Sequence, residues 1–311
     1  MFLLLVFSWV SATDANAAPC CSGSSAIPAM ITGDDRAQIS ASFSHATVIG
    51  DAFEGGLPQF RSSDQSETTN FFRLDGARLI SDRMQVGAGL SLLSRQFSTP
   101  SSHAGKSLPG DLILNFAYEA LPEWEYSEWK PRGHVFIATT IPTGRSIYEA
   151  NEPGLIDSTG KGFFRIAMGA ILTKRWDLWD ASFITEIHRS LPRTFPPTAS
   201  DPDPLRVDAG FGGSFALGMG YSPGGGNFRF GIRLQPSFNQ PKERTTLTGV
   251  TKSSRSQVID TSLEASYLLS DQGGGTWTGF GNFNDQTLIG PAVSSTLNRT
   301  IALGIQHRWD R

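Results

Sequence analysis

Two Ser-His pairs in this chain combine residue types that could catalyse acyl transfer. Ser44 precedes His45 and Ser102 precedes His103, and acyl-transfer enzymes use a hydroxyl beside an imidazole. Adjacent residues of a β-strand point to opposite faces, however, so neither pair forms a ready nucleophile–base couple. The chain also has no Gly-x-Ser-x-Gly and no His-Glu-x-x-His pattern. We therefore expect no enzyme, and we predict no cofactor.

Two adjacent thiols, Cys20 and Cys21, could capture a soft metal ion. Two ligands make an incomplete site, and neither thiol has a distant partner cysteine with which to cross-link the fold. We favour an incidental or disulfide-forming pair in an oxidising compartment, and keep a metal site only as a weak alternative.

Charged residues of both signs recur in stretches where polar and apolar residues alternate. Between positions 228 and 235, for example, Phe, Phe, Ile and Leu alternate with Arg, Gly, Arg and Gln. A period of two gives a β-strand one apolar and one polar face. If the polar faces are enclosed, they line a lumen, and the charged residues predicted to do so are Arg73, Asp75, Arg95, Glu119, Arg165, Glu186, His188, Asp208, Arg229, Arg233, Asp260, Glu264 and Arg308.

The positions of these charges predict at least one ion pair. Arg233 and Glu264 should lie at similar depth on neighbouring strands, so we expect them to pair. Pairs of this kind often stabilise a barrel interior, and for any single residue we favour that role over solute selection. Together the charged residues make the lumen polar.

The same alternation predicts the strands that carry these side chains. A tilted membrane-spanning strand needs about 9–11 residues, more than an ordinary strand of about 5–6. We predict about twelve strands, an even number as bacterial single-chain barrels require. They lie near 36–49, 68–80, 84–97, 111–121, 133–143, 163–174, 181–190, 206–221, 228–238, 257–269, 276–288 and 299–309.

The connections and the tryptophans give this sheet two different ends. Short connections, with a longer exception at 122–132, alternate with long ones near 50–67, 98–110, 144–162, 191–205, 239–256 and 289–298. Every tryptophan beyond position 17 falls at the short-turn end, as a membrane-interface girdle would: Trp124, Trp129, Trp176, Trp179, Trp277 and Trp309. A thinner outer girdle is predicted from Phe71, Phe72, Phe97, Tyr148, Phe163 and Phe238.

The sequence therefore predicts an all-β fold, an antiparallel transmembrane β-barrel with short periplasmic turns and longer extracellular loops. A secreted, soluble all-β protein is the alternative.

The apolar run at 2–7, followed by Ala15-Asn16-Ala17, indicates a secretory signal. We expect a signal peptide at 1–17, a periplasmic tail at 18–35 and an outer-membrane barrel at 36–311. The end of the last strand, near Trp309, resembles the signature by which outer-membrane barrels are recognised for insertion, which implies the barrel-assembly machinery and outer-membrane lipid as partners.

A short sequence resemblance to a known family also favours a membrane barrel. Gly110-Asp111-Leu112 opens a strand, and Ile141-Pro142-Thr143-Gly144 closes the next one. This order resembles the outer-membrane transporters grouped with the meta-pathway of phenol degradation. The resemblance covers about a tenth of the chain and implies a barrel of a transport-like class, without assigning phenol as a substrate.

An interior formed by about twelve strands falls between that of eight strands, which side chains fill, and that of 16–18 strands, which leaves an aqueous channel. We therefore expect an outer-membrane channel or transporter with a narrow polar lumen and a small-molecule solute as its partner. The formal net charge of −3 gives no basic surplus for nucleic acid. The alternatives are a barrel enzyme, such as a lipid hydrolase or acyltransferase, and a structural or adhesive barrel.

Overall fold

The structure is a computed structural model, and it describes residues 29–53, 57–62, 64–123, 127–197, 203–224, 226–271, 274–290 and 292–311. The expected signal peptide, Cys20, Cys21 and Trp124 lie outside these residues.

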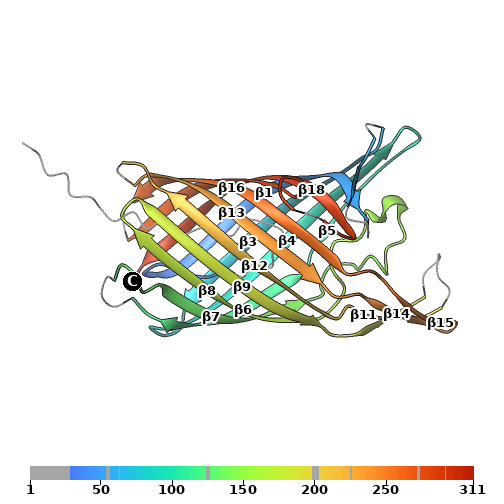
Figure 1. Cartoon of the computed structure of the whole chain (residues 1–311), viewed down its shortest axis with the longest axis horizontal. Coiled ribbons are helices and arrows are strands. Elements are labelled where there is room, and N and C mark those ends of the chain that lie inside the picture. The colour runs from blue at the N-terminus through green and yellow to red at the C-terminus, as the bar shows by residue number, and fades with distance from the viewer. Residues whose placement is uncertain are drawn as a thin grey trace, which may run out of the picture.

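Twelve long strands of the described chain form one closed antiparallel sheet (Figure 1). β1 pairs with β3 on one side and with β18 on the other, in a register that runs from Asp35 opposite Asp310 to Ala52 opposite Ser295. The strands are β1 (Asp35–Ala52), β3 (Ser66–Leu79), β4 (Met84–Thr99), β6 (Leu112–Leu121), β7 (Arg132–Ile141), β8 (Arg165–Trp176), β9 (Trp179–Ser190), β12 (Phe211–Tyr221), β13 (Phe228–Asn239), β16 (Ser256–Asp271), β17 (Gly275–Asp285) and β18 (Ser295–Asp310). The predicted twelve-stranded barrel is confirmed.

The alternating sequence gives the barrel an apolar outside and a largely polar inside. In β12, Phe215, Leu217 and Met219 are each about half exposed, whereas Ala216 is buried. Successive side chains of a strand point to opposite faces, so the exposed apolar set must cover the outer wall. An outer wall of this kind matches the hydrocarbon interior of a membrane.

Six short strands and one turn of 3-10 helix extend the long-loop end. β5 (Ser102–Pro109) continues the sheet beside the outer half of β4, and β2 (Pro58–Phe60) does so beside the end of β1. β10 (Arg193–Phe195), β11 (Leu205–Asp208), β14 (Glu243–Thr246) and β15 (Gly249–Lys252) form a separate sheet. β11, β14 and β15 lie at the end opposite the C-terminus (Figure 1). The 3-10 turn η1 spans Pro153–Leu155, and no helix among the described residues is long and apolar enough to cross a membrane.

The predicted strand at 206–221 is wrong in its first part, because the chain bends at Gly210. Gly210 has a φ of 66°, a backbone conformation that glycine adopts without a steric penalty, and its N–H donates to Asp208 Oδ1 at 2.9 Å. Residues 205–208 therefore leave the barrel wall and join the outer sheet as β11.

Aromatic side chains gather at the C-terminal end of the barrel, as predicted. Trp176 and Trp179 flank the β8–β9 turn, and both are substantially exposed, as are Trp129, Trp277 and Trp309. The indole N–H of Trp176 donates to the Glu128 carbonyl at 2.8 Å. Indoles with one apolar side and one polar partner suit a membrane interface.

The predicted outer girdle is only partly correct. Phe72 and Phe238 are exposed on the outer wall. Phe163 is buried, and it packs with Tyr148 and Phe195 at the barrel mouth instead. Phe71 and Phe97 lie on the inward parity of β3 and β4, opposite Leu93 and Glu67 respectively. Phe71 has the same parity as Arg73, and Phe97 the same parity as Arg95, so alternation along the strands already indicated an inward position for both rings.

The apolar outer wall predicts that a charged substitution destabilises the barrel more at the centre of the membrane than at its edge. Leu303 lies mid-way along β18 on the exposed face, so Leu303→Arg should lower the free energy of unfolding in lipid vesicles by about 2–4 kcal/mol. Phe238→Arg, on the same outer face at the mouth end of β13, should cost only about 0–1 kcal/mol from its charge. Urea unfolding in vesicles measures both, and equal costs would contradict membrane burial of this wall.

Candidate functional site: the lumen and its two inserted segments

The half of the lumen towards the C-terminal end is lined by paired charges that come from β9, β13 and β16. Arg229 donates to both carboxylate oxygens of Asp180, at 2.7 and 2.6 Å, and lies 3.4 Å from Glu264. Arg233 lies 2.5 Å from the other Glu264 oxygen, which confirms the predicted Arg233–Glu264 pair. Both guanidinium groups are almost fully buried, and buried charges persist in a protein only when paired.

A second polar cluster lies towards the mouth. Arg165 of β8 pairs with Glu186 of β9, and its guanidinium lies 2.9 Å from Nδ1 of His188. His188 Nδ1 also lies 3.1 Å from Glu186 Oε1, and its Nε2 lies 3.2 Å from Asn239 Oδ1. The charge of Arg165, together with desolvation, lowers the pKa of the nearby Lys161 from 10.5 to about 8. Lys161 belongs to the loop at 144–162 and brings an ionisable amine to the space beside this cluster.

The other predicted lumen residues are paired as well. Arg73 lies 2.7 Å from Asp75, Glu119 lies 2.6 Å from Arg132, and Asp260 accepts a hydrogen bond from Gln286 at 2.7 Å. Arg308 lies 3.5 Å from Asp35. Asp208 is different, because it belongs to β11 of the outer sheet, where it pairs with Arg189 at 2.8 Å.

The segment directly before β1 lies inside the barrel. The side-chain amide of Gln85 donates to the Ile31 carbonyl at 2.9 Å and accepts from the Ile31 N–H at 2.7 Å. Gln38 donates to the Met30 carbonyl at 3.0 Å, and Asn115 donates to the Ala29 carbonyl at 3.1 Å. Residues 29–34, expected in a periplasmic tail, therefore enter the lumen, because inward amides satisfy their backbone groups.

Met30 covers an apolar part of the inner wall. It belongs to a buried cluster with Phe136, Ile171 and Ile184, and with alanines of β6, β7, β8 and β12. A barrel filled only with water would expose these side chains to the solvent, so burying them stabilises the inserted segment. The lumen thus has charged regions and one apolar region.

The loop at 144–162 is the second inserted segment, and the residues of the short sequence resemblance hold its base. Asp111 accepts from the Gly144 N–H at 3.1 Å through one oxygen and from the Lys161 N–H at 2.8 Å through the other. Thr143 accepts from the Leu112 N–H at 3.0 Å and donates to the Gly110 carbonyl at 2.7 Å. A single carboxylate therefore joins both ends of the loop. The two motifs lie at the facing ends of the adjacent strands β6 and β7, so their positions in the sequence could have indicated this contact.

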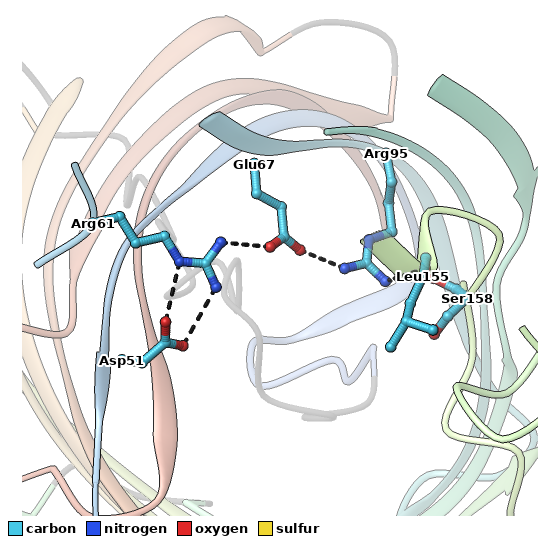
Figure 2. A network of polar contacts seen from close by, with 6 residues as sticks. All are labelled: Asp51, Arg61, Glu67, Arg95, Leu155 and Ser158. Carbon is cyan, nitrogen blue, oxygen red and sulfur yellow. Dashed lines mark hydrogen bonds and ion pairs between the residues drawn. The ribbon is translucent and has the colours of Figure 1, made fainter. Parts of the chain in front are cut away.

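A chain of ionic contacts fixes the middle of the loop to the part of the wall formed by β1, β3 and β4 (Figure 2). Arg61 bridges Asp51 at 3.1 Å and Glu67 at 2.7 Å, and Glu67 in turn binds Arg95 at 2.6 Å. Arg95 then donates to the backbone carbonyls of Leu155 and Ser158, at 3.1 and 3.0 Å. We call the four charged residues Asp51, Arg61, Glu67 and Arg95 the latch. Sequence analysis identified Arg95 as a lumen residue but missed its partners, which come from a predicted loop.

Asp157 organises the loop internally. Its carboxylate is fully buried, and it accepts from the backbone N–H groups of Asn151 and Glu152, at 3.1 and 3.3 Å, and pairs with Arg145 at 3.0 Å. Burial acts to raise the pKa of this carboxyl, but the hydrogen bonds and the Arg145 charge outweigh it, so the pKa lies below the ordinary value of 3.8. The ionised form is therefore the one that holds the loop in shape.

Comparison with known proteins finds the fold and no family. No family model and no curated protein matches the chain. Among solved structures, the COG4313 outer membrane channel from Pseudomonas putida F1 superposes with a TM-score of 0.64 at 14% identity, over 88% of this chain and 95% of that one. A mutant of the monoaromatic hydrocarbon channel TodX matches with a TM-score of 0.45 at 9% identity, over 90% and 92%. The translocator domain of the autotransporter NalP from Neisseria meningitidis matches with a TM-score of 0.41 at 12% identity, over 88% of each chain. The first similarity supports the barrel fold, whereas the TM-scores of the other two are too low to support a structural inference.

The buried Asp157 predicts how the loop responds to pH. Since the pKa is depressed in the folded protein, the carboxylate stabilises the docked loop above the ordinary value of 3.8, and this stabilisation is lost as the pH falls through the lower, folded pKa. Asp157→Asn removes the charge at every pH and should weaken docking by about 1–3 kcal/mol at neutral pH. Limited proteolysis with trypsin, which cuts after Arg145 and Lys161, should then cleave the loop in the variant much faster than in the unaltered protein. Glu152→Gln, which breaks only an exposed pair with Lys106, is the matched control and should change cleavage little. Equal cleavage of both variants would contradict the assigned role of Asp157.

Proposed function

We propose that this protein is an outer-membrane channel for small solutes, held closed at rest by residues 29–34 and by the loop 144–162. The observation that carries this proposal is that both inserted segments are held in a closed barrel by hydrogen bonds to inward side chains. Contacts of this kind can break and form again without disturbing the barrel wall. A barrel with a purely structural role has no need for two such separable contacts.

The solute class follows from the chemistry of the wall. The paired charges and His188 offer polar contacts, whereas Phe136, Ile171 and Ile184 become exposed once Met30 leaves. Small molecules with both a hydrocarbon or aromatic part and a polar group fit such a lumen. The name of one similar structure, an outer membrane channel, supports transport in general terms.

In this proposal the latch controls the mouth. Arg95 holds the loop through two backbone carbonyls, and Glu67 orients Arg95. Loss of the Arg95 guanidinium would leave those carbonyls without their donor, which favours a loop exposed to water. The remaining assignments belong to the same proposal: export by a signal at 1–17, insertion by the barrel-assembly machinery and residence in outer-membrane lipid.

Single-channel recording in planar bilayers tests the channel. Protein lacking residues 1–17 should show rare, small openings. Protein lacking residues 1–34 and the Arg95→Gln variant should each open at least about tenfold more often, since about 1.4 kcal/mol shifts an equilibrium tenfold. Lys106→Gln, which removes an exposed cation outside the latch, should behave as the parent protein does.

The outcome for the truncated protein decides the proposal. If protein lacking residues 1–34 folds, as heat-modifiable gel mobility would show, and still conducts nothing with Arg95→Gln added, the channel proposal is wrong. A parent protein that conducts as freely as the variants would keep the channel but reject the two segments as closures.

One outward-facing constellation favours a second candidate, hydrolysis of membrane lipid. His45 Nδ1 lies 2.8 Å from Asn70 Oδ1, and the Thr47 hydroxyl lies 3.3 Å from His45 Nε2. A hydroxyl, an imidazole and an orienting amide oxygen are the parts of a nucleophilic triad. They are brought together by the two-residue spacing along β1 and by pairing with β3, and the sequence analysis did not find them.

Release of fatty acid from phospholipid micelles tests this second candidate. His45→Ala should lower such release by about 100-fold or more, since general-base catalysis contributes at least about that factor. Thr47→Ala should do the same, whereas His103→Ala on the β5 hairpin should not. An unaltered protein without hydrolytic activity would eliminate this candidate and leave the channel.

A further inference from the structure

We propose that the outer wall carries a binding site for an anionic, phosphate-bearing lipid of the outer leaflet, formed where β12, β13 and β16 meet the long-loop end. This site goes beyond the proposed transport function. It requires only that the barrel spans the membrane with its long loops outward.

The site begins at a gap in the wall. β12 and β13 pair continuously from Tyr221 opposite Phe230 to Leu217 opposite Leu234, and pairing resumes only at Ser214 opposite Ser237. The register is unchanged across this gap, so Phe215 faces Pro236. Proline has no N–H to donate to the ladder. The missing hydrogen bond marks a local weakness in the wall, next to which a foreign group can pack.

An apolar hollow of about 420 Å³ lies on this gap. Phe215, Pro236 and Phe238 line it, and the two rings are about half exposed on the lipid-facing side. Gln257 of β16, which pairs with Phe238, closes its far side. An apolar hollow open to the membrane fits a lipid acyl chain better than it fits a polar solute.

A second hollow, of about 670 Å³, continues the first one away from the membrane. The two share Pro241 and Arg255, and Lys252, Ser253 and Ser254 line the outer one. Arg255 is exposed, and Lys252 is two-thirds exposed although it lies 3.1 Å from Glu243. Two cations and the Ser254 hydroxyl form a region complementary to phosphate, because they offer both positive charge and hydrogen-bond donors.

The depth of this pair of hollows suits a lipid. The outward residues of β13 run from Phe228 to Phe238, ten residue steps that span about 33 Å along the strand. At a tilt of about 40°, this length crosses an apolar band of about 25 Å. Phe238 therefore lies at the outer edge of the band, with the shared Arg255 just beyond it, at the level of the headgroups. An acyl chain beside Phe238 would place its phosphate near Arg255 and Lys252.

Native mass spectrometry of the detergent-solubilised barrel, titrated with diphosphoryl lipid A, tests the site. The unaltered protein should bind this lipid at least about tenfold more tightly than it binds the same glycolipid without its phosphates. The double variant Lys252→Gln with Arg255→Gln should lose at least about tenfold in affinity. Each basic residue near a membrane surface strengthens the affinity for anionic lipid by a factor of about five. Phe238→Ser should also weaken binding of the lipid.

Controls separate this site from nonspecific binding. Lys106→Gln removes a cation at the same end of the barrel but far along the wall, on β5, and should leave the affinity unchanged. Heat-modifiable mobility should show that every variant is folded. Equal binding of the phosphorylated and dephosphorylated lipids, unchanged binding by the double variant, or full displacement of the lipid by inorganic phosphate would overturn the proposal.

Discussion

The pairing of β1 with β18 is the contact on which the rest of the molecule depends. In hydrocarbon no water is present to satisfy backbone N–H and C=O groups, so a sheet can cross a membrane only when it has no open edge. The edge is closed by pairing Asp35–Ala52 with Ser295–Asp310, in a register that shifts between Asp35 and Ala37 and between Val48 and Gly50. This pairing also fixes which side chains face inward, and hence the chemistry of the lumen.

Enclosure explains why almost every charged lumen residue has a partner. A charge within the wall has little water around it, so Arg229 contacts both Asp180 and Glu264, and Arg165 contacts Glu186 and His188. The same requirement applies to backbone groups brought inside. The inward amides of Gln85, Gln38 and Asn115 therefore bind residues 29–34, and the Arg95 guanidinium binds the loop carbonyls. The interior is thus held by side-chain hydrogen bonds, whereas the wall is held by the backbone ladder.

These two modes of bonding set how much the sequence could predict. The wall follows a period of two, so all twelve strands were predicted, and the parity of Arg233 and Glu264 predicted their ion pair. The interior has no period. A single glutamine such as Gln85, or a carboxylate such as Asp111, determines where a whole segment lies, and nothing in its neighbours reveals its partner tens of residues away. For the same reason the bend at Gly210 was missed, because alternation continues through it in sequence.

The lumen holds residues 29–34 as it would hold an extended peptide ligand, and this ligand is joined directly to the wall at Asp35. A tether this short gives the segment a very high effective concentration at its own site. Rebinding is then a unimolecular event whose rate does not depend on how much protein the membrane contains. A free peptide or solute that competes for Gln85 must therefore reach a concentration comparable to this effective concentration before it can displace the segment.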